Sequence, residues 1–124
     1  MSKQPISNPN EKTINKFSMP DIEKSGGATN ATTAKLMEAL KKGEGLTTQT
    51  ARKLIFENED QDHDGKKTRK ALRSAQAKLR LAGFKTVRLS AGVQKIYFAY
   101  QTDQDRAELD QLAKSKGLNI TEIS

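Results

Sequence analysis

The sequence lacks cysteine and tryptophan and has a single histidine, His63, among its 124 residues. Without cysteine there are no disulfide bonds and no thiolate chemistry, and one histidine alone argues against a zinc site. No apolar run approaches the ~20 residues that a membrane-spanning helix needs, and the N-terminus lacks the apolar segment of a secretion signal. These absences predict a cytoplasmic protein with no metal, no cofactor and no membrane partner.

Acidic residues are absent from one long stretch of the chain. Residues 66–101 hold ten cations and no acid, so the net charge of +7 arises in this block. Its neighbours are acidic, with five cations against seven acids in residues 32–65 and three against five in residues 102–124. Four of the ten cations are arginines, which suit bidentate contacts with phosphate and guanine. The block predicts a polyanionic partner, with nucleic acid as the first candidate.

The composition divides the chain into three parts. Residues 1–31 are rich in Ser, Asn, Lys, Gly and Pro and show no hydrophobic period, which predicts a flexible, disordered tail. Residues 32–101 are expected to form the nucleic-acid-binding domain. Residues 102–124 are expected to add a helix, which either completes the core or provides a homodimer contact.

The expected elements are three helices, a hairpin and a fourth helix, an α+β domain. Apolar spacing and capping residues place the helices at about 32–42, 48–55, 66–82 and 102–116. Residues 84–100 alternate as a hairpin does, with a break at Ser90-Ala91-Gly92. Residues 118–123 form either a short strand or a frayed end.

The third expected helix has two sharply different faces. At 100° per residue, a buried seam of Leu72, Ala75, Leu79 and Ala82 is expected on one side. The opposite side collects Lys66, Arg69, Lys70, Arg73, Ala77 and Arg80. Like charges three and four residues apart repel, and binding to phosphates compensates for that repulsion. The stripe therefore predicts contact with nucleic acid, against the alternative of a solvated lysine-rich face.

The hairpin extends the basic surface. A turn centred on Ala91-Gly92 would place Val87 opposite Ile96 and Arg88 opposite Lys95. Directly opposed cations are unfavourable, which again indicates an anionic partner. An outward-facing Tyr97 would permit stacking on a base, as RNA-binding surfaces do.

Three helices followed at once by a hairpin within residues 32–101 resembles the winged helix-turn-helix superfamily of DNA-binding proteins. The resemblance implies a three-helix domain with a two-stranded wing, acting as a small transcriptional regulator on double-stranded DNA. It also implies that Arg69, Lys70, Arg73, Ser74 and Ala77 face base edges, and that Arg88, Gln94 and Lys95 contact the backbone or minor groove. The candidate nucleic-acid-binding residues are Lys66, Arg69, Lys70, Arg73, Ser74, Ala77, Arg80, Lys85, Arg88, Gln94 and Lys95.

The acidic loop before the third helix matches half of a calcium-binding motif. Asp60, Asp62, Asp64 and Gly65 fit the start of an EF-hand loop, but Ala71 stands where the bidentate glutamate is required. Capping of the third helix by Asp62 or Asp64 is the simpler role. No catalytic constellation is present, so an enzyme is not expected. The alternatives to DNA binding are an RNA-associated protein that uses the same surface and a module that binds an acidic protein.

Overall fold

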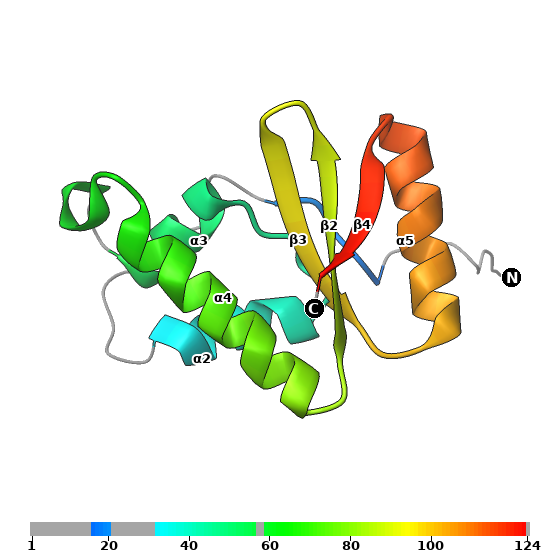
Figure 1. Ribbon diagram of the computed structural model, residues 1–124, viewed down its shortest axis with the longest axis horizontal. Coiled ribbons are helices and arrows are strands. Elements are labelled where there is room, and N and C mark those ends of the chain that lie inside the picture. The colour runs from blue at the N-terminus through cyan, green and yellow to red at the C-terminus, as the bar shows by residue number, and fades with distance from the viewer. Residues whose placement is uncertain (1–15, 21–31, 57–58, 124) are drawn as a thin grey trace, which may run out of the picture.

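The computed structural model describes residues 16–20, 32–56 and 59–123. The rest of the expected tail, residues 1–15 and 21–31, lies outside the described residues, as do residues 57–58 of the acidic loop. The described chain is an α+β domain with four α-helices and a three-stranded antiparallel sheet (Figure 1).

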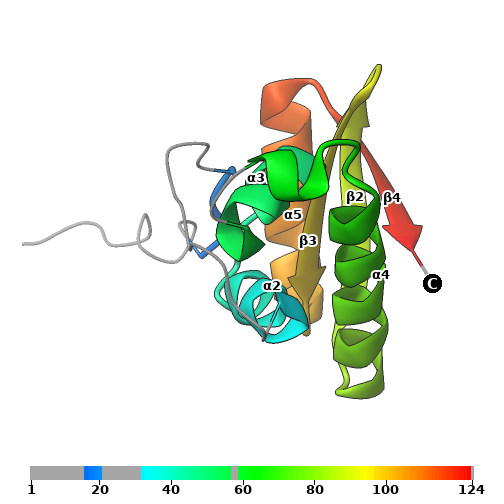
Figure 2. The ribbon, with the colours of Figure 1, turned by 90° about the vertical axis from the view of Figure 1, so that its left-hand side faces the viewer.

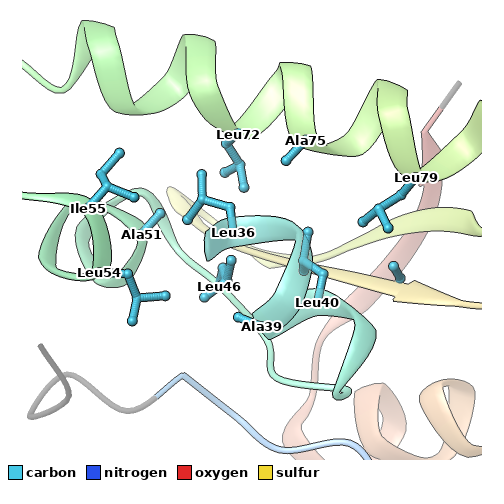
Figure 3. Packing of buried hydrophobic residues seen from close by; sticks show 11 residues of the cluster. Leu36, Ala39, Leu40, Leu46, Ala51, Leu54, Ile55, Leu72, Ala75 and Leu79 are labelled. Atoms are coloured by element: carbon cyan, nitrogen blue, oxygen red, sulfur yellow. The ribbon is translucent and has the colours of Figure 1, made fainter. Parts of the chain in front are cut away.

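Three helices enclose the first hydrophobic core: α2 (Thr32–Lys41), α3 (Thr48–Ile55) and α4 (Lys66–Leu81). Leu36, Leu40, Ile55 and Leu79 are at most 1% exposed and point into the space between these helices (Figure 3). The helix pattern of the sequence therefore corresponds to real packing faces. One residue of the expected seam differs, because Ala82 is exposed. Helix α4 ends at Leu81, and Gly83, with φ +98°, turns the chain away.

Side-chain caps fix where α3 begins. The amide of Thr50 donates to Thr47 Oγ1 at 3.1 Å, and the amide of Thr47 donates to Thr50 Oγ1 at 2.8 Å. This reciprocal pair satisfies amides that lack a partner within the helix.

The start of α4 is capped from the acidic loop, as expected. A 3₁₀ turn, η1 (Glu59–Asp62), brings the carboxylate of Asp62 to the amides of Lys67 and Thr68, at 3.0 and 2.8 Å. The hydroxyl of Thr68 donates to the same carboxylate. Burial would raise the pKa of Asp62, but the hydrogen bonds from Thr68 and Lys67 and the charge of Arg52 hold it below its usual value. The carboxylate of Asp62 therefore stabilises the N-terminus of α4.

The sheet consists of a hairpin and a third strand from the C-terminal end of the described chain. Strands β2 (Lys85–Ala91) and β3 (Gln94–Tyr100) pair with each other, and β4 (Asn119–Ile123) pairs with the other edge of β2. The expected hairpin is present but is part of a three-stranded sheet, and residues 118–123 contribute the short strand rather than a frayed end. After α5 (Asp103–Lys116), Gly117 takes φ +69° and reverses the chain, so that β4 pairs with the free edge of β2.

The hairpin register also differs from the expected one. The loop consists of Gly92 and Val93, because Ala91 pairs with Gln94. Gly92, with φ +60°, occupies the first central position, where hairpin turns of this length require a positive φ. Arg88 consequently pairs with Tyr97 rather than with Lys95, and the argument from directly opposed cations is wrong.

A second core lies between the sheet and α5. Val87, Leu89 and Phe98 pack with Leu109 and Ala113 of this helix, and all five are at most 2% exposed. Figure 1 shows α5 and α4 on opposite sides of the strands. Helix α5 thus takes part in the core of its own chain.

Residues 16–20 are part of this packing, which the expectation of a flexible tail missed. Phe17 is buried against Phe98, with ring centroids 6.0 Å apart in an edge-to-face arrangement. Ser18 exchanges backbone hydrogen bonds with Gly43 and Gly45, at 2.9 and 2.7 Å. These contacts hold the segment against the connection between α2 and α3.

The connection between α2 and α3 also joins the sheet. Leu46 exchanges both backbone hydrogen bonds with Tyr97 of β3, at 2.9 and 2.7 Å. The hairpin is therefore attached to the helical part through β3 as well as through the chain that follows α4.

Candidate nucleic-acid interface

The outer face of α4 is a continuous basic surface. The helix carries seven cations and no acid, and buries Thr68, Leu72, Ala75, Gln76 and Leu79 on its inner side. Most residues expected on the outer face are exposed, namely Lys66, Arg69, Lys70, Arg73 and Ala77, and Ser74 is half-buried. Lys67 and Lys78 are exposed as well and widen the basic face on its other flank. Both residues lie outside the arc of the expected stripe, although they belong to the same basic block of the sequence.

The side chains of these cations form no ion pair within the part of the chain that the structure describes, although Asp62 and Asp64 of the acidic loop lie beside the first turn of the helix. Among the described residues, none of the ten cations in residues 66–101 forms an ion pair with a carboxylate. The ion pairs of the described chain instead involve Lys16 with Asp105, and Arg106 with Asp110 and Glu122. The positive charge on α4 is thus directed to solvent.

Arg80 differs from the other cations of the expected stripe. It is half-buried, and its Nη1 donates to Thr86 Oγ1 of β2 at 2.8 Å. The hydroxyl of Thr86 in turn donates to the carbonyl oxygen of Ile123 in β4, at 3.0 Å. Arg80 therefore joins α4 to two strands of the sheet, a role that the sequence pattern did not reveal.

The strand register sorts the hairpin residues onto two faces. Side chains alternate along a strand, so cross-strand partners share a face. One row consists of Arg88, Tyr97 and Thr121, and the next of Ser90, Lys95 and Asn119. Both lie on the face that adjoins α4, because Thr86, the partner of Arg80, is on that face too.

Lys85 lies on the opposite face of the sheet from Arg88. It pairs with Tyr100, on the face covered by α5, near Glu122. The hydrogen bond from Tyr100 and the charges of Arg106 and Lys85 lower the pKa of Glu122. The structure thus brings Arg88 and Lys95 to the face that adjoins α4, but not Lys85.

The hairpin loop projects as an exposed tip. Gln94 and Lys95 are exposed, and Val93 is 99% exposed. Tyr97 is half-buried against the helical core, which limits the stacking role considered for it.

The part of the chain that the structure describes contains no group of three histidine or acidic side chains arranged to hold a metal. Within the same residues, no helix has both the length and the apolarity for crossing a bilayer. The chain matches no protein-family model, no curated protein and no solved structure. The geometry of the chain itself is therefore the basis for assigning a function.

Proposed function

We propose that this protein binds double-stranded DNA as a winged helix-turn-helix protein, with α4 as the recognition helix and the β2–β3 hairpin as the wing. Regulation of transcription is the role that such a protein would serve. The observation that carries the proposal is the outer face of α4, where six exposed cations lie on one helix without an ion pair to a carboxylate among the described residues.

The scaffold supports this assignment. Three packed helices precede the hairpin, and the Leu46–Tyr97 bridge and the Arg80–Thr86 hydrogen bond attach the hairpin to them. An α-helix about 10–12 Å across fits a major groove about 12 Å wide. A helix held on one face and exposed on the other can enter that groove without unfolding.

The two halves of α4 would have different tasks. Arg69, Lys70 and Arg73 are exposed in its first two turns, where helix-turn-helix proteins contact base edges. Arg80, in the last turn, is engaged by the sheet. We therefore assign base and phosphate contacts to the first two turns and a positioning role to Arg80.

The test is charge reversal on α4 with a matched control on α5. Arg73→Glu should weaken the binding of a labelled duplex by roughly a hundredfold, because an attraction to phosphate becomes a repulsion. Lys114→Glu makes the same change of charge at an exposed site of α5 and should alter affinity by less than about threefold. Fluorescence anisotropy measures affinity, and a thermal melt of each variant shows that it is folded. A folded Arg73→Glu variant with wild-type affinity would refute the proposal.

The same titration separates the alternatives. Tighter binding of an RNA of equal length would favour an RNA-associated protein. Failure to bind either nucleic acid at low salt would leave an acidic protein as the partner of the basic surface.

A further inference from the structure

The sheet face that adjoins α4 carries cationic and neutral polar side chains, and some of them come from β4 rather than from the hairpin. Two rows of this face contain two cations, two hydroxyl side chains, an amide and a tyrosine, and no carboxylate: the exposed Lys95, Thr121 and Asn119 and the half-buried Arg88, Ser90 and Tyr97. The opposite face of the same strands carries Glu122. Strand β4 therefore presents its only acid away from α4 and its neutral donors toward it.

The position of this face relative to α4 is fixed. Arg80 donates to Thr86, and Thr86 donates to the carbonyl of Ile123, so α4, β2 and β4 are joined by consecutive hydrogen bonds. Figure 2 shows α4 and β4 on the same side of the molecule, with α2 and α3 on the other. A polyanion that lies along α4 would meet the face of β4 next to it.

Two buried donors along this junction have no acceptor among the described residues. They are Nε2 of Gln76, a residue only 5% exposed, and Nε of Arg88. Gln76 precedes Arg80 by one helical turn, and Arg88 follows Thr86 by two residues on the same sheet face. Buried donors without acceptors are rare in folded proteins. Of the two residues, half-buried Arg88 also carries a charge, and this charge has no ion pair among the described residues.

We propose that β4 forms a second contact surface for DNA, in which Thr121 and Asn119 together with Arg88 hold the phosphate backbone beside the groove that α4 enters. This inference rests on the proposed function and extends it to a strand outside the three-helix-and-hairpin unit. In this arrangement Arg88 neutralises a phosphate, whereas Thr121 and Asn119 donate neutral hydrogen bonds that fix the position of the backbone.

A gain of charge tests the inference without relying on a loss of folding. Thr121 is exposed on a strand at the edge of the sheet, where lysine is well tolerated. Thr121→Lys should raise affinity for a labelled duplex about three- to tenfold and steepen the dependence of affinity on salt by about one unit. Gln111→Lys adds the same charge to an exposed site of α5 and should leave the salt slope unchanged.

A second pair of variants separates the two kinds of contact. Arg88→Ala should lower the salt slope by about one unit, whereas Thr121→Val should weaken binding about threefold at an unchanged slope, because a neutral donor releases no counterion. Equal slopes for Thr121→Lys, Gln111→Lys and wild type, with wild-type affinity for Thr121→Val, would overturn the role of β4. The proposed function is judged separately by Arg73→Glu, which lies on α4 alone.

Discussion

Helices α4 and α5 lie on opposite sides of the same sheet and differ in how their charged side chains are paired. Helix α5 begins with Asp103 and Asp105 and ends with Lys114 and Lys116, an order that complements the helix dipole. Its Arg106 binds Asp110 and Glu122, and its Asp105 binds Lys16. Helix α4 has cations in its first turn and its last, and no acid of its own.

The difference shows which charges contribute to the fold. In α5 three of the charged side chains form ion pairs, Arg106 with Asp110 and Glu122 and Asp105 with Lys16, so these charges stabilise the chain that carries them. In α4 the charges repel, and the helix depends on its buried apolar face and on an acid supplied from outside, Asp62. The proposed DNA partner would neutralise these charges.

The largest effect on stability is expected where α4 depends on that outside acid. Asp62→Ala removes the acceptor of two backbone amides and leaves the buried hydroxyl of Thr68 without its partner. We expect a loss of about 2 kcal/mol in the free energy of unfolding, measured by urea denaturation. Asp64→Ala, the control, removes one exposed hydrogen bond to the amide of Lys66 and should cost about 0.5 kcal/mol. Equal losses in the two variants would contradict the capping role of Asp62.

Acid should act on both helices in the same direction. The pKa of Asp62 is lowered because hydrogen bonds from Thr68 and Lys67 outweigh the effect of burial. The pKa of Asp105 is lowered because its bonds with Lys16 and with backbone amides also outweigh burial. A carboxyl with a lowered pKa stabilises the folded state above its unfolded-state pKa, and this stability is lost as the pH falls through the folded-state value.

The resulting expectation is a free energy of unfolding that is constant near neutral pH and falls below about pH 5. Asp62→Asn should flatten this fall, because one of the linked groups no longer titrates. Urea denaturation at a series of pH values measures it. A wild-type slope in the Asp62→Asn variant would show that this carboxyl does not carry the linkage.

The sequence predicted the parts of the fold that local patterns determine. Periodic apolar residues marked the helices, and the hairpin was visible in the alternation of Val87, Leu89, Ile96 and Phe98. The register was not, because it depends on which two residues take the turn, and the glycine at position 92 fits more than one loop. The docking of Phe17 and the pairing of β4 depend on contacts between distant segments, for which a single sequence has no local signal.

The candidate interface divides in the same way. The charge block and the helix period placed Arg69, Lys70 and Arg73 on one exposed face. The roles of Arg80 and Lys85 were missed because each is set by a tertiary contact: Thr86 holds the first, and strand alternation turns the second toward Glu122. No local pattern singles out Thr121 and Asn119, because their place on this face follows from the pairing of β4 with β2.

The smallest expected change in stability tests the contrast between the two helices most directly. An arginine-to-glutamate substitution should stabilise the protein on α4 and destabilise it on α5. Arg69 is exposed in the first turns of α4, three residues after Lys66 and four before Arg73. Arg69→Glu replaces two repulsions with two attractions and places an acid near the positive end of the helix dipole, so stability should rise by about 0.5 kcal/mol. Affinity for duplex DNA should nevertheless fall at least about tenfold.

The matched change on α5, Arg106→Glu, breaks the contacts with Asp110 and Glu122, so it should lower stability and leave DNA affinity unchanged. Denaturation and anisotropy on both variants measure the two quantities. If Arg69→Glu and Arg106→Glu both lowered stability and both lowered DNA affinity, α4 and α5 would not differ in function as proposed.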